Sequence, residues 1–289
     1  MSKKHAFFLQ SCFQRLFRSG AMHCPSCGGK PSSVLDRKHA VLTFARCSQC
    51  ELLYRQPTTP PEQSRDFYQD DYAQGYTTDM PDDAALRELT ARKFAGTERD
   101  YSRFIAMFDA LGMSRGSRVL EFGCSWGYGA WQLAQAGYEV QAYEVSRPRC
   151  RYAREKLQVD AVDVLEAIEG KFDLIFSSHV LEHVDVLGRS LDFLDARLRD
   201  GGLMVHVTPN GSAAYREAAP HNWHLLWGEV HPQLLDEKFC LHRYRGRALL
   251  LGSTPSDPAV LQEWDRKQTK VLPLNGQELL FAVRGTNEA

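Results

Sequence analysis

The sequence lacks any apolar run of the length that a membrane-spanning helix requires, and it shows no signal peptide with a long uncharged core. It also lacks a large net charge: the formal net charge is −1, so no overall electrostatic field selects a nucleic acid or a membrane as partner. These absences predict a cytoplasmic protein. The 289 residues, 43% of them hydrophobic, suffice for the core of one large domain and one small one.

Charge and cysteine are concentrated near the N-terminus. The first 60 residues carry nine Lys and Arg against two Asp and Glu, whereas the rest of the chain is acidic. Four of the eight cysteines form two Cys-x-x-Cys pairs nineteen residues apart, which in a cytosolic chain favours a metal site. Four thiolates suit structural zinc, and residues 33–45 between the pairs predict a hairpin, as in a zinc ribbon. Disulfides or an iron–sulfur centre are the alternatives. The four ligands are Cys24, Cys27, Cys47 and Cys50.

Two further segments of this first part have recognisable patterns. Residues 6–18 place apolar side chains at helical spacing, which predicts an amphipathic helix that packs on its own protein or a second subunit, or that contacts a membrane surface. Residues 56–83 are rich in proline and tyrosine, so we expect a linker that either packs on the core or folds over a cleft, where Tyr72 or Tyr76 would touch substrate. Residues 84–111 predict one or two helices.

A glycine turn between a strand and a helix is the main feature of the second part. Residues 119–122 form a short apolar strand, Gly123 and Gly127 bracket a turn, and an apolar helix follows from about Tyr128. Glycine permits positive φ and close ligand approach, and the helix start offers unpaired N–H groups, so the turn predicts nucleotide binding. Glu144 ends the next strand about twenty residues on, where an acid is placed to bind both hydroxyls of a ribose.

Apolar strands alternate with helices over this part, which is typical of a doubly wound, Rossmann-like α/β fold with a mainly parallel sheet. Ligands of such sheets lie beyond the carboxyl ends of the strands. Glu121 stands two residues before the first glycine, where it would repel a pyrophosphate and favours a ligand with a positive pole. The expected strands lie near residues 118–122, 138–144, 159–162, 172–177 and 203–208.

The segment Glu121-Phe-Gly123-Cys-Ser125-Trp-Gly127 resembles motif I of the class I S-adenosylmethionine-dependent methyltransferases, with Ser125 in place of the middle glycine. The resemblance continues through residues 172–184, with a Leu-Glu-His turn after the fourth strand, and residues 200–210, with a Gly-Gly turn before the fifth. It covers roughly residues 100–285. It implies S-adenosylmethionine as cofactor and an antiparallel last strand at residues 278–284.

The resemblance also implies a role for each cofactor-binding residue. The acid of motif I orients the methionine ammonium group, the glycine turn passes beneath the methionine and ribose, and the acid at the end of the second strand holds the ribose hydroxyls. Two residues after the third strand meet the adenine, and Ser178 with His179 lines the methyl end. The implied cofactor residues are Glu121, Gly123, Ser125, Gly127, Glu144, Asp163, Val164 and Ser178.

Methyl transfer from a sulfonium needs alignment, and a base only where the acceptor loses a proton. Candidates for that base are His179, His224 and His231, whereas His183 is more typical of a structural member of its turn. The segment 221–231 lies where the acceptor pocket forms in the family that the chain resembles. Packing and hydrogen bonding alone are the main alternative explanation of that segment, and a metal bound by His221, His224 and His231 is a lesser one.

Three hypotheses for the function follow. The first is a methyltransferase for a small-molecule or glycan acceptor, such as a sugar, a nucleotide-sugar or a polysaccharide precursor. The second is a zinc-ribbon RNA methyltransferase, which the acidic catalytic part and the missing Asn-Pro-Pro-Tyr type motif disfavour. The third is a binding module without catalysis. The expected domains are an N-terminal helix (1–20), a zinc ribbon (21–56), a linker with a helical lid (57–100) and a class I methyltransferase domain (101–289).

Overall fold

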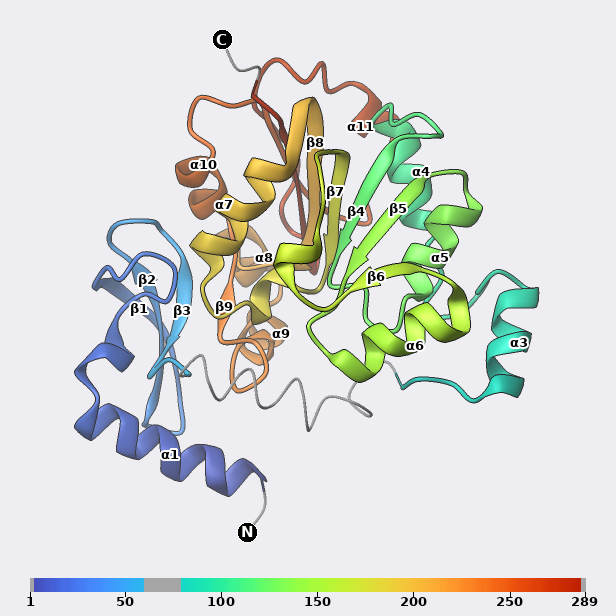
Figure 1. The fold of residues 1–289 in the computed structure, drawn as a ribbon. Coiled ribbons are helices and arrows are strands. Elements are labelled where there is room, and N and C mark those ends of the chain that lie inside the picture. The colour runs from blue at the N-terminus through green and yellow to red at the C-terminus, as the bar shows by residue number, and fades with distance from the viewer. Residues whose placement is uncertain (1–2, 60–78, 287–289) are drawn as a thin grey trace.

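The computed structural model describes residues 3–59 and 79–286, which form two sheets. The smaller sheet has the order β1-β2-β3-β9 and the larger one the order β11-β10-β12-β8-β7-β4-β5-β6. Figure 1 shows strands β1, β2 and β3 of the smaller sheet, in blue, beside the larger, helix-covered sheet. The predicted linker contacts of Tyr72 and Tyr76 lie outside the described residues.

The strands of the smaller sheet are β1 (Pro31–Lys38), β2 (Leu42–Cys47), β3 (Leu53–Gln56) and β9 (Gln233–Leu234). Those of the larger sheet are β4 (Arg118–Phe122), β5 (Glu139–Tyr143), β6 (Asp160–Val162), β7 (Phe172–Ser178), β8 (Leu198–Pro209), β10 (Leu249–Thr254), β11 (Lys270–Val271) and β12 (Glu278–Arg284). The α-helices are α1 (Lys3–Phe17), α3 (Asp83–Ala91), α4 (Ser102–Ala110), α5 (Tyr128–Gln135), α6 (Arg147–Leu157), α7 (Leu187–Arg197), α8 (Ala213–Ala218), α9 (Pro220–Leu226), α10 (Glu237–Arg243) and α11 (Pro258–Gln262). Short 3-10 turns are η1 (Ser19–Met22), η3 (Leu165–Ala167) and η4 (Leu181–His183).

The larger sheet confirms the predicted mainly parallel α/β fold. Strands β8, β7, β4, β5 and β6 are parallel neighbours, and β12 runs antiparallel between β8 and β10. The strands read as continuous apolar runs because helices cover both faces: α7 and α10 pack on one, and α4 and α11 on the other (Figure 1). Parallel pairing brings the carboxyl ends of β4, β5, β6 and β7 to one edge, where the predicted cofactor residues gather.

Strand β10 is the element that sequence patterns did not reveal. Its residues 249–251 are fully or almost fully buried, and the strand lies between β12 and β11 in the sheet. A short apolar run does not distinguish a buried strand from a helix, and only pairing with the antiparallel β12 decides the matter here.

The N-terminal hairpin is joined to the large domain by sheet pairing and by aromatic packing. Strand β3 pairs with β9, with Leu53 opposite Leu234, so a segment from the second half of the chain completes the smaller sheet. Phe44 of β2 stacks on Trp227, with ring centroids 4.8 Å apart, and meets Trp223 edge-on. The hairpin therefore shares an apolar cluster with α9 and is not an independent appendage.

A buried ion pair adds to this junction and provides a stability prediction. Asp236 is fully buried; it accepts a hydrogen bond from Arg46 at 2.6 Å and also caps α10. The substitution Arg46→Ala leaves that carboxylate unpaired, so we expect it to lower the free energy of unfolding by about 3 kcal/mol, measured by chemical denaturation. Arg37→Ala, an equal charge change at an exposed position of β1, is the control and should cost less than about 0.5 kcal/mol. Equal losses in the two variants would contradict this role.

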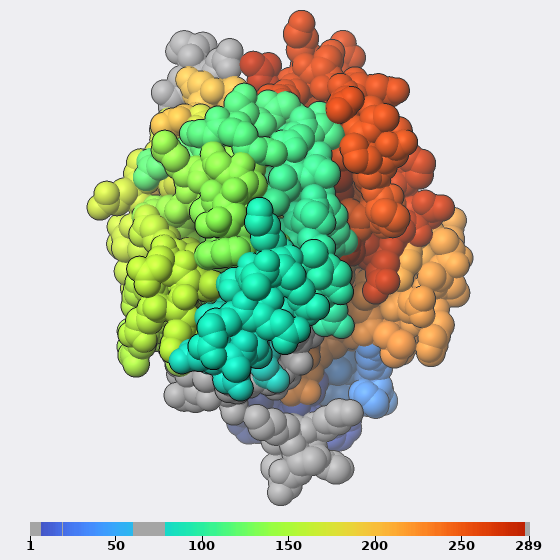
Figure 2. Space-filling view, turned by 90° about the vertical axis from the view of Figure 1, so that its right-hand side faces the viewer, coloured from blue at the N-terminus to red at the C-terminus, as the bar shows by residue number. Residues whose placement is uncertain are grey.

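Helix α1 forms as predicted, but its apolar stripe faces outward in the described structure. Phe13 and Leu16 are 59% and 75% exposed, whereas the polar Ser11 and Gln14 are buried on the opposite side. Helix α3 lies on the surface of the large domain. Figure 2 shows its segment, in teal, beside α5 and α6. No helix among residues 3–59 and 79–286 has the length and apolarity needed to cross a membrane.

Candidate functional site

The glycine turn after β4 has the backbone geometry that its residues suggested. Gly123 and Gly127 have φ of 86° and 90°, and Ser125 between them also takes a left-handed φ of 53°. A Cβ at Gly123 would lie 2.3 Å from Val180, and one at Gly127 would lie 2.7 Å from Ala153. The two glycines are therefore required by close packing on the η4 turn and on α6, as well as by backbone conformation.

Ser125 is held in this conformation by a buried arginine. The guanidinium of Arg149, on α6, donates a hydrogen bond to Ser125 Oγ at 2.7 Å, and Arg149 is fully buried. A left-handed conformation is costly for a residue with a Cβ, and this hydrogen bond offsets part of that cost. The serine in place of the middle glycine thus has its own structural support in this chain.

Glu144 faces the glycine turn from the end of β5. Its two carboxylate oxygens accept hydrogen bonds from the backbone N–H groups of Ser125 at 2.9 Å and Ser146 at 2.8 Å. Burial raises the pKa of Glu144 to about 7, against the opposing effects of the Ser146 N–H, of Arg149 and of the Ser125 N–H. A carboxylate has about four acceptor positions, so two remain for hydroxyl groups of a ligand.

Glu121 lies under the same turn, at the end of β4. The hydroxyl of Tyr101 donates to its Oε1 at 2.7 Å, and a Cβ at Gly129 would clash with both groups. Its Oε2 is buried, and no described residue donates to it with hydrogen-bond geometry. Burial raises the pKa of Glu121 to about 7, although the Tyr101 hydroxyl and the nearby backbone N–H of Ala130 lower it. A buried oxygen without a donor is suited to accept from a cationic ligand.

The other predicted cofactor residues lie at neighbouring strand ends. Asp163 follows β6 and stands 3.5 Å from the guanidinium of Arg147 across an exposed ion pair. Val164 is 45% exposed, which is unusual for valine beside a core strand. Ser178 ends β7, the strand that pairs with β4. All three therefore lie at the edge that carries Glu121 and Glu144.

The imidazole of His179 lies between the carboxylates of Glu182 and Glu278. Its Nε2 lies 2.7 Å from Glu278 Oε1 and its Nδ1 lies 3.4 Å from Glu182 Oε1. Partial burial lowers its pKa, but the hydrogen bonds to Glu182 and Glu278 outweigh this effect and raise the pKa to about 10. His179 is therefore protonated at neutral pH, which is not the state in which a histidine accepts a proton.

The structure separates the other histidines that the sequence grouped together. His224, on α9, lies 2.6 Å from Asp36 of the hairpin, and Trp227 donates to the same carboxylate at 2.8 Å. His231 is instead next to His183 of the η4 turn, with ring centroids 4.8 Å apart. In the described residues, the group of potential metal ligands that includes His231 therefore contains neither His221 nor His224.

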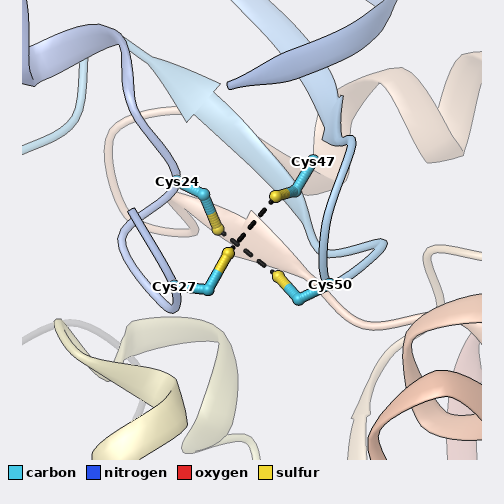
Figure 3. A group of neighbouring side chains, drawn as sticks. All are labelled: Cys24, Cys27, Cys47 and Cys50. Carbon is cyan, nitrogen blue, oxygen red and sulfur yellow. Dashed lines mark hydrogen bonds between the residues drawn. The ribbon is translucent and has the colours of Figure 1, made fainter. Parts of the chain in front are cut away.

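The four predicted cysteine ligands come together as two loops facing each other. Figure 3 shows their sulfur atoms turned toward one another, with Cys24 near Cys50 at 3.6 Å and Cys27 near Cys47 at 3.4 Å. Ligands at 2.3 Å from a tetrahedral zinc ion would be about 3.8 Å apart, so the group fits such an ion. All eight cysteines lie in the described residues and are free thiols.

The turns around this cysteine group are as tight as a metal knuckle requires. A Cβ at Gly29 would lie 2.9 Å from Cys47 Sγ, and the Gln49 N–H points at that sulfur at 3.4 Å. Glu51, which follows the second cysteine pair, has a left-handed φ of 65°, a conformation that is costly for a residue with a Cβ. The backbone turns after both cysteine pairs are thus tight enough to bring the four sulfur atoms together.

Sequence patterns missed Tyr101 and Arg149, the two side chains that support the candidate acids. Neither belongs to a motif, and both reach the turn only because α4 and α6 pack against it. A fully buried arginine is rare. The sequence does not show that Arg149 is buried, so only the structure could single this residue out.

Comparisons with known proteins agree with this fold. The family described as "Methyltransferase domain" matches residues 92–249. The chain is 31% identical over 138 residues to the ubiquinone biosynthesis O-methyltransferase of Methylocella silvestris, which is 44% of this chain and 51% of that protein. It is 26% identical over 116 residues to a probable fatty acid methyltransferase of Mycobacterium tuberculosis, which is 36% of this chain and 27% of that protein. The matched part is about a quarter to a half of these relatives.

Among solved structures, the plantazolicin methyltransferase BamL, determined in complex with a triazolic desmethylPZN analog and SAH, has a similar fold. The TM-score is 0.51 at 14% identity, and the match covers 78% of this chain and 97% of that one. At this identity the similarity concerns the fold of the chain alone.

Proposed function

The chain belongs to the family of methyltransferase domains, and from this we propose that it transfers the methyl group of S-adenosylmethionine to a small-molecule acceptor. The observation that carries the proposal is the pair of buried acids, Glu121 and Glu144, that flank the glycine turn at one edge of the sheet. S-adenosylmethionine supplies an activated methyl group on a sulfonium ion, so the protein has to supply binding and alignment.

The residues present fit this cofactor. Glu121 Oε2 is a buried acceptor without a donor, suited to the methionine ammonium group, and Glu144 keeps acceptor positions for the ribose hydroxyls. The exposed Val164 and the neighbouring Asp163 offer an apolar surface and a polar group for the adenine. We propose that Gly123, Ser125, Gly127 and Ser178 complete the cofactor site.

The three histidines predicted as possible bases have different proposed roles. His179, which is protonated, would position Glu278 at the end of β12 and present a cation to the acceptor side. His224 would serve the contact between the hairpin and α9 through Asp36. His231 is considered with its neighbours in the next subsection.

We propose an acceptor that is a small organic molecule. The relatives named for ubiquinone biosynthesis and for a fatty acid support this class. A sugar or polysaccharide precursor is our finer proposal, and it rests on the sequence resemblance. The zinc ribbon, with Cys24, Cys27, Cys47 and Cys50, is proposed as structural, since four cysteine ligands leave no open position at a tetrahedral ion.

The RNA alternative is weakened by the use that the hairpin makes of its basic residues. Lys38 donates to the Trp227 carbonyl and lies over its ring at 4.5 Å, Arg46 pairs with Asp236, and Arg55 is buried. These cations are engaged within the protein, whereas RNA binding needs them on the phosphates.

A labelling experiment separates these acceptors. Lysate of the source cells is incubated with the protein and cofactor carrying a labelled methyl group, and then fractionated into RNA, lipid, glycan and small molecules. We expect label in the small-molecule or glycan fraction. Label in RNA would favour the alternative, and a protein that binds no cofactor in calorimetry would leave only the non-catalytic scaffold.

The raised pKa values of the two acids predict that cofactor binding depends on pH. A cationic ligand binds the ionised carboxylates, and both groups lose their charge as the pH falls through about 7. We therefore expect the Kd for S-adenosylmethionine to rise about tenfold when the pH falls from 7 to 6, and to level off above pH 8. Calorimetric titration measures this. Glu121→Gln should flatten part of the dependence, and a flat profile for the unaltered protein would contradict the assignment.

A further inference from the structure

Three potential metal ligands meet beside the methyl end of the predicted cofactor site. Glu182 and His183 belong to η4, directly after β7, and His231 precedes β9. One donor atom from each residue lies within 4.8 Å of the other two. Glu182 is fully buried, and the two histidines are partly buried. We call this group the Glu182–His183–His231 cluster.

Both histidines of the cluster are fixed in one tautomer by the backbone. His183 Nδ1 lies 2.8 Å from the carbonyl of Val230, and His231 Nδ1 lies 2.6 Å from the carbonyl of Leu226. A carbonyl only accepts, so each Nδ1 carries a proton, and in the neutral ring the lone pair then lies on Nε2. This is the arrangement of metal-binding histidines, which donate their other N–H to a carbonyl or a carboxylate.

The carboxylate of Glu182 is held by a hydroxyl on one oxygen and faces the imidazole rings of His179 and His183 with the other. Its Oε2 accepts a hydrogen bond from Thr208 Oγ1 at 2.9 Å. Its Oε1 is buried; it lies 3.4 Å from the Nδ1 of the protonated His179 and 3.7 Å from His183 Nε2. A protonated His183 at hydrogen-bond distance would satisfy that oxygen, but 3.7 Å is too long for a hydrogen bond. A cation between Glu182, His183 and His231 would contact this oxygen and the Nε2 atoms of both histidines.

The two segments that carry the cluster are held together rigidly. The side-chain amide of Gln233, which is 1% exposed, donates to the carbonyls of Leu181 at 2.7 Å and Val184 at 2.8 Å. Strand β9 is thereby tied to the η4 turn on both sides of the histidine and glutamate ligands. The ligands are thus held in place before any ion arrives, which lowers the cost of binding it.

We propose that Glu182, His183 and His231 bind one divalent first-row transition-metal ion, distinct from the ion of the cysteine group. Two imidazole nitrogens and one carboxylate suit zinc, manganese, iron or cobalt better than magnesium or calcium, which prefer oxygen ligands alone. Three protein ligands leave coordination positions open. If the proposed methyl transfer is correct, an oxygen atom of the acceptor would occupy one of them, because η4 follows the strand end that lines the methyl side.

Cobalt binding tests this site without relying on activity. The full-length protein, with its cysteine-bound metal retained, is treated with a mild chelator, desalted and titrated with Co²⁺ by calorimetry and visible absorption. We expect one Co²⁺ ion per chain beyond the cysteine site, with the weak bands of nitrogen and oxygen ligation and no sulfur charge-transfer band. His231→Ala should weaken binding by at least about 100-fold, since loss of outer-shell partners alone costs 10–100-fold.

Matched variants keep the test decisive. His242→Ala removes an exposed histidine of α10 and should leave Co²⁺ binding unchanged. Thr208→Val retains the shape of the core and removes only the support of Glu182, so it should weaken binding about tenfold even if His231→Ala fails to fold. Absence of the second Co²⁺ ion, or unchanged affinity in the cluster variants, would overturn the proposal. Titration of S-adenosylmethionine on the same samples tests the proposed function separately.

Discussion

Replacing Cys47 by serine is expected to release the zinc ion that we propose for the cysteine group and to unfold the N-terminal hairpin. Structural zinc contributes an apparent binding free energy of about 10–16 kcal/mol in small zinc domains, so losing one of four thiolates removes much of the stability of β1 to β3. Metal content per chain, measured by mass spectrometry after the second proposed site has been emptied with a mild chelator, should fall from one equivalent toward zero. The thermal unfolding temperature should fall with it.

The effect should reach the large domain because the hairpin covers part of its surface. Phe44 stacks on Trp227, and β3 pairs with β9, so loss of the hairpin exposes two tryptophans and Leu234. Tryptophan emission should therefore shift to longer wavelength in the variant. Cys12→Ser, which alters a cysteine of α1 outside the group, is the control and should change neither metal content nor emission. A Cys47→Ser protein that retains its metal would contradict a four-thiolate site.

Replacing Glu144 by alanine is expected to abolish useful binding of S-adenosylmethionine. The variant lacks the carboxylate that would accept hydrogen bonds from the two ribose hydroxyls. Each such bond to a charged acceptor is worth about 1.5–3 kcal/mol, so the Kd for the cofactor should rise at least about 100-fold. It would also lose the backbone bonds that hold Ser125 and Ser146. Calorimetric titration with the cofactor measures the change.

Two further variants separate binding from folding. Glu144→Gln keeps the size and one acceptor oxygen, so its affinity should lie between those of the unaltered protein and Glu144→Ala. Glu155→Ala removes an equal charge from an exposed position on α6 and should bind the cofactor normally. Each protein is also unfolded thermally. Normal cofactor affinity in a folded Glu144→Ala protein would contradict the site that we propose.

The sequence alone determined the features that depend on local pattern. The parallel strands β4 to β8, the hairpin and the glycine turn follow from apolar periodicity and turn residues over a few neighbouring positions. Four cysteines at two close spacings likewise indicated their group, because the ligands of each pair are adjacent in the chain. Patterns of this kind can be recognised without knowledge of the fold.

Only the tertiary structure decided which distant side chains meet. His224 and His231 are seven positions apart, yet one faces Asp36 of the hairpin and the other faces His183 of the η4 turn. Tyr101 supports Glu121 through the packing of α4 on the sheet, and β10 is a strand because β12 lies beside it. Contacts of this kind depend on how helices and strands pack against one another. The sequence around each of the two contacting residues has no local pattern that identifies its partner.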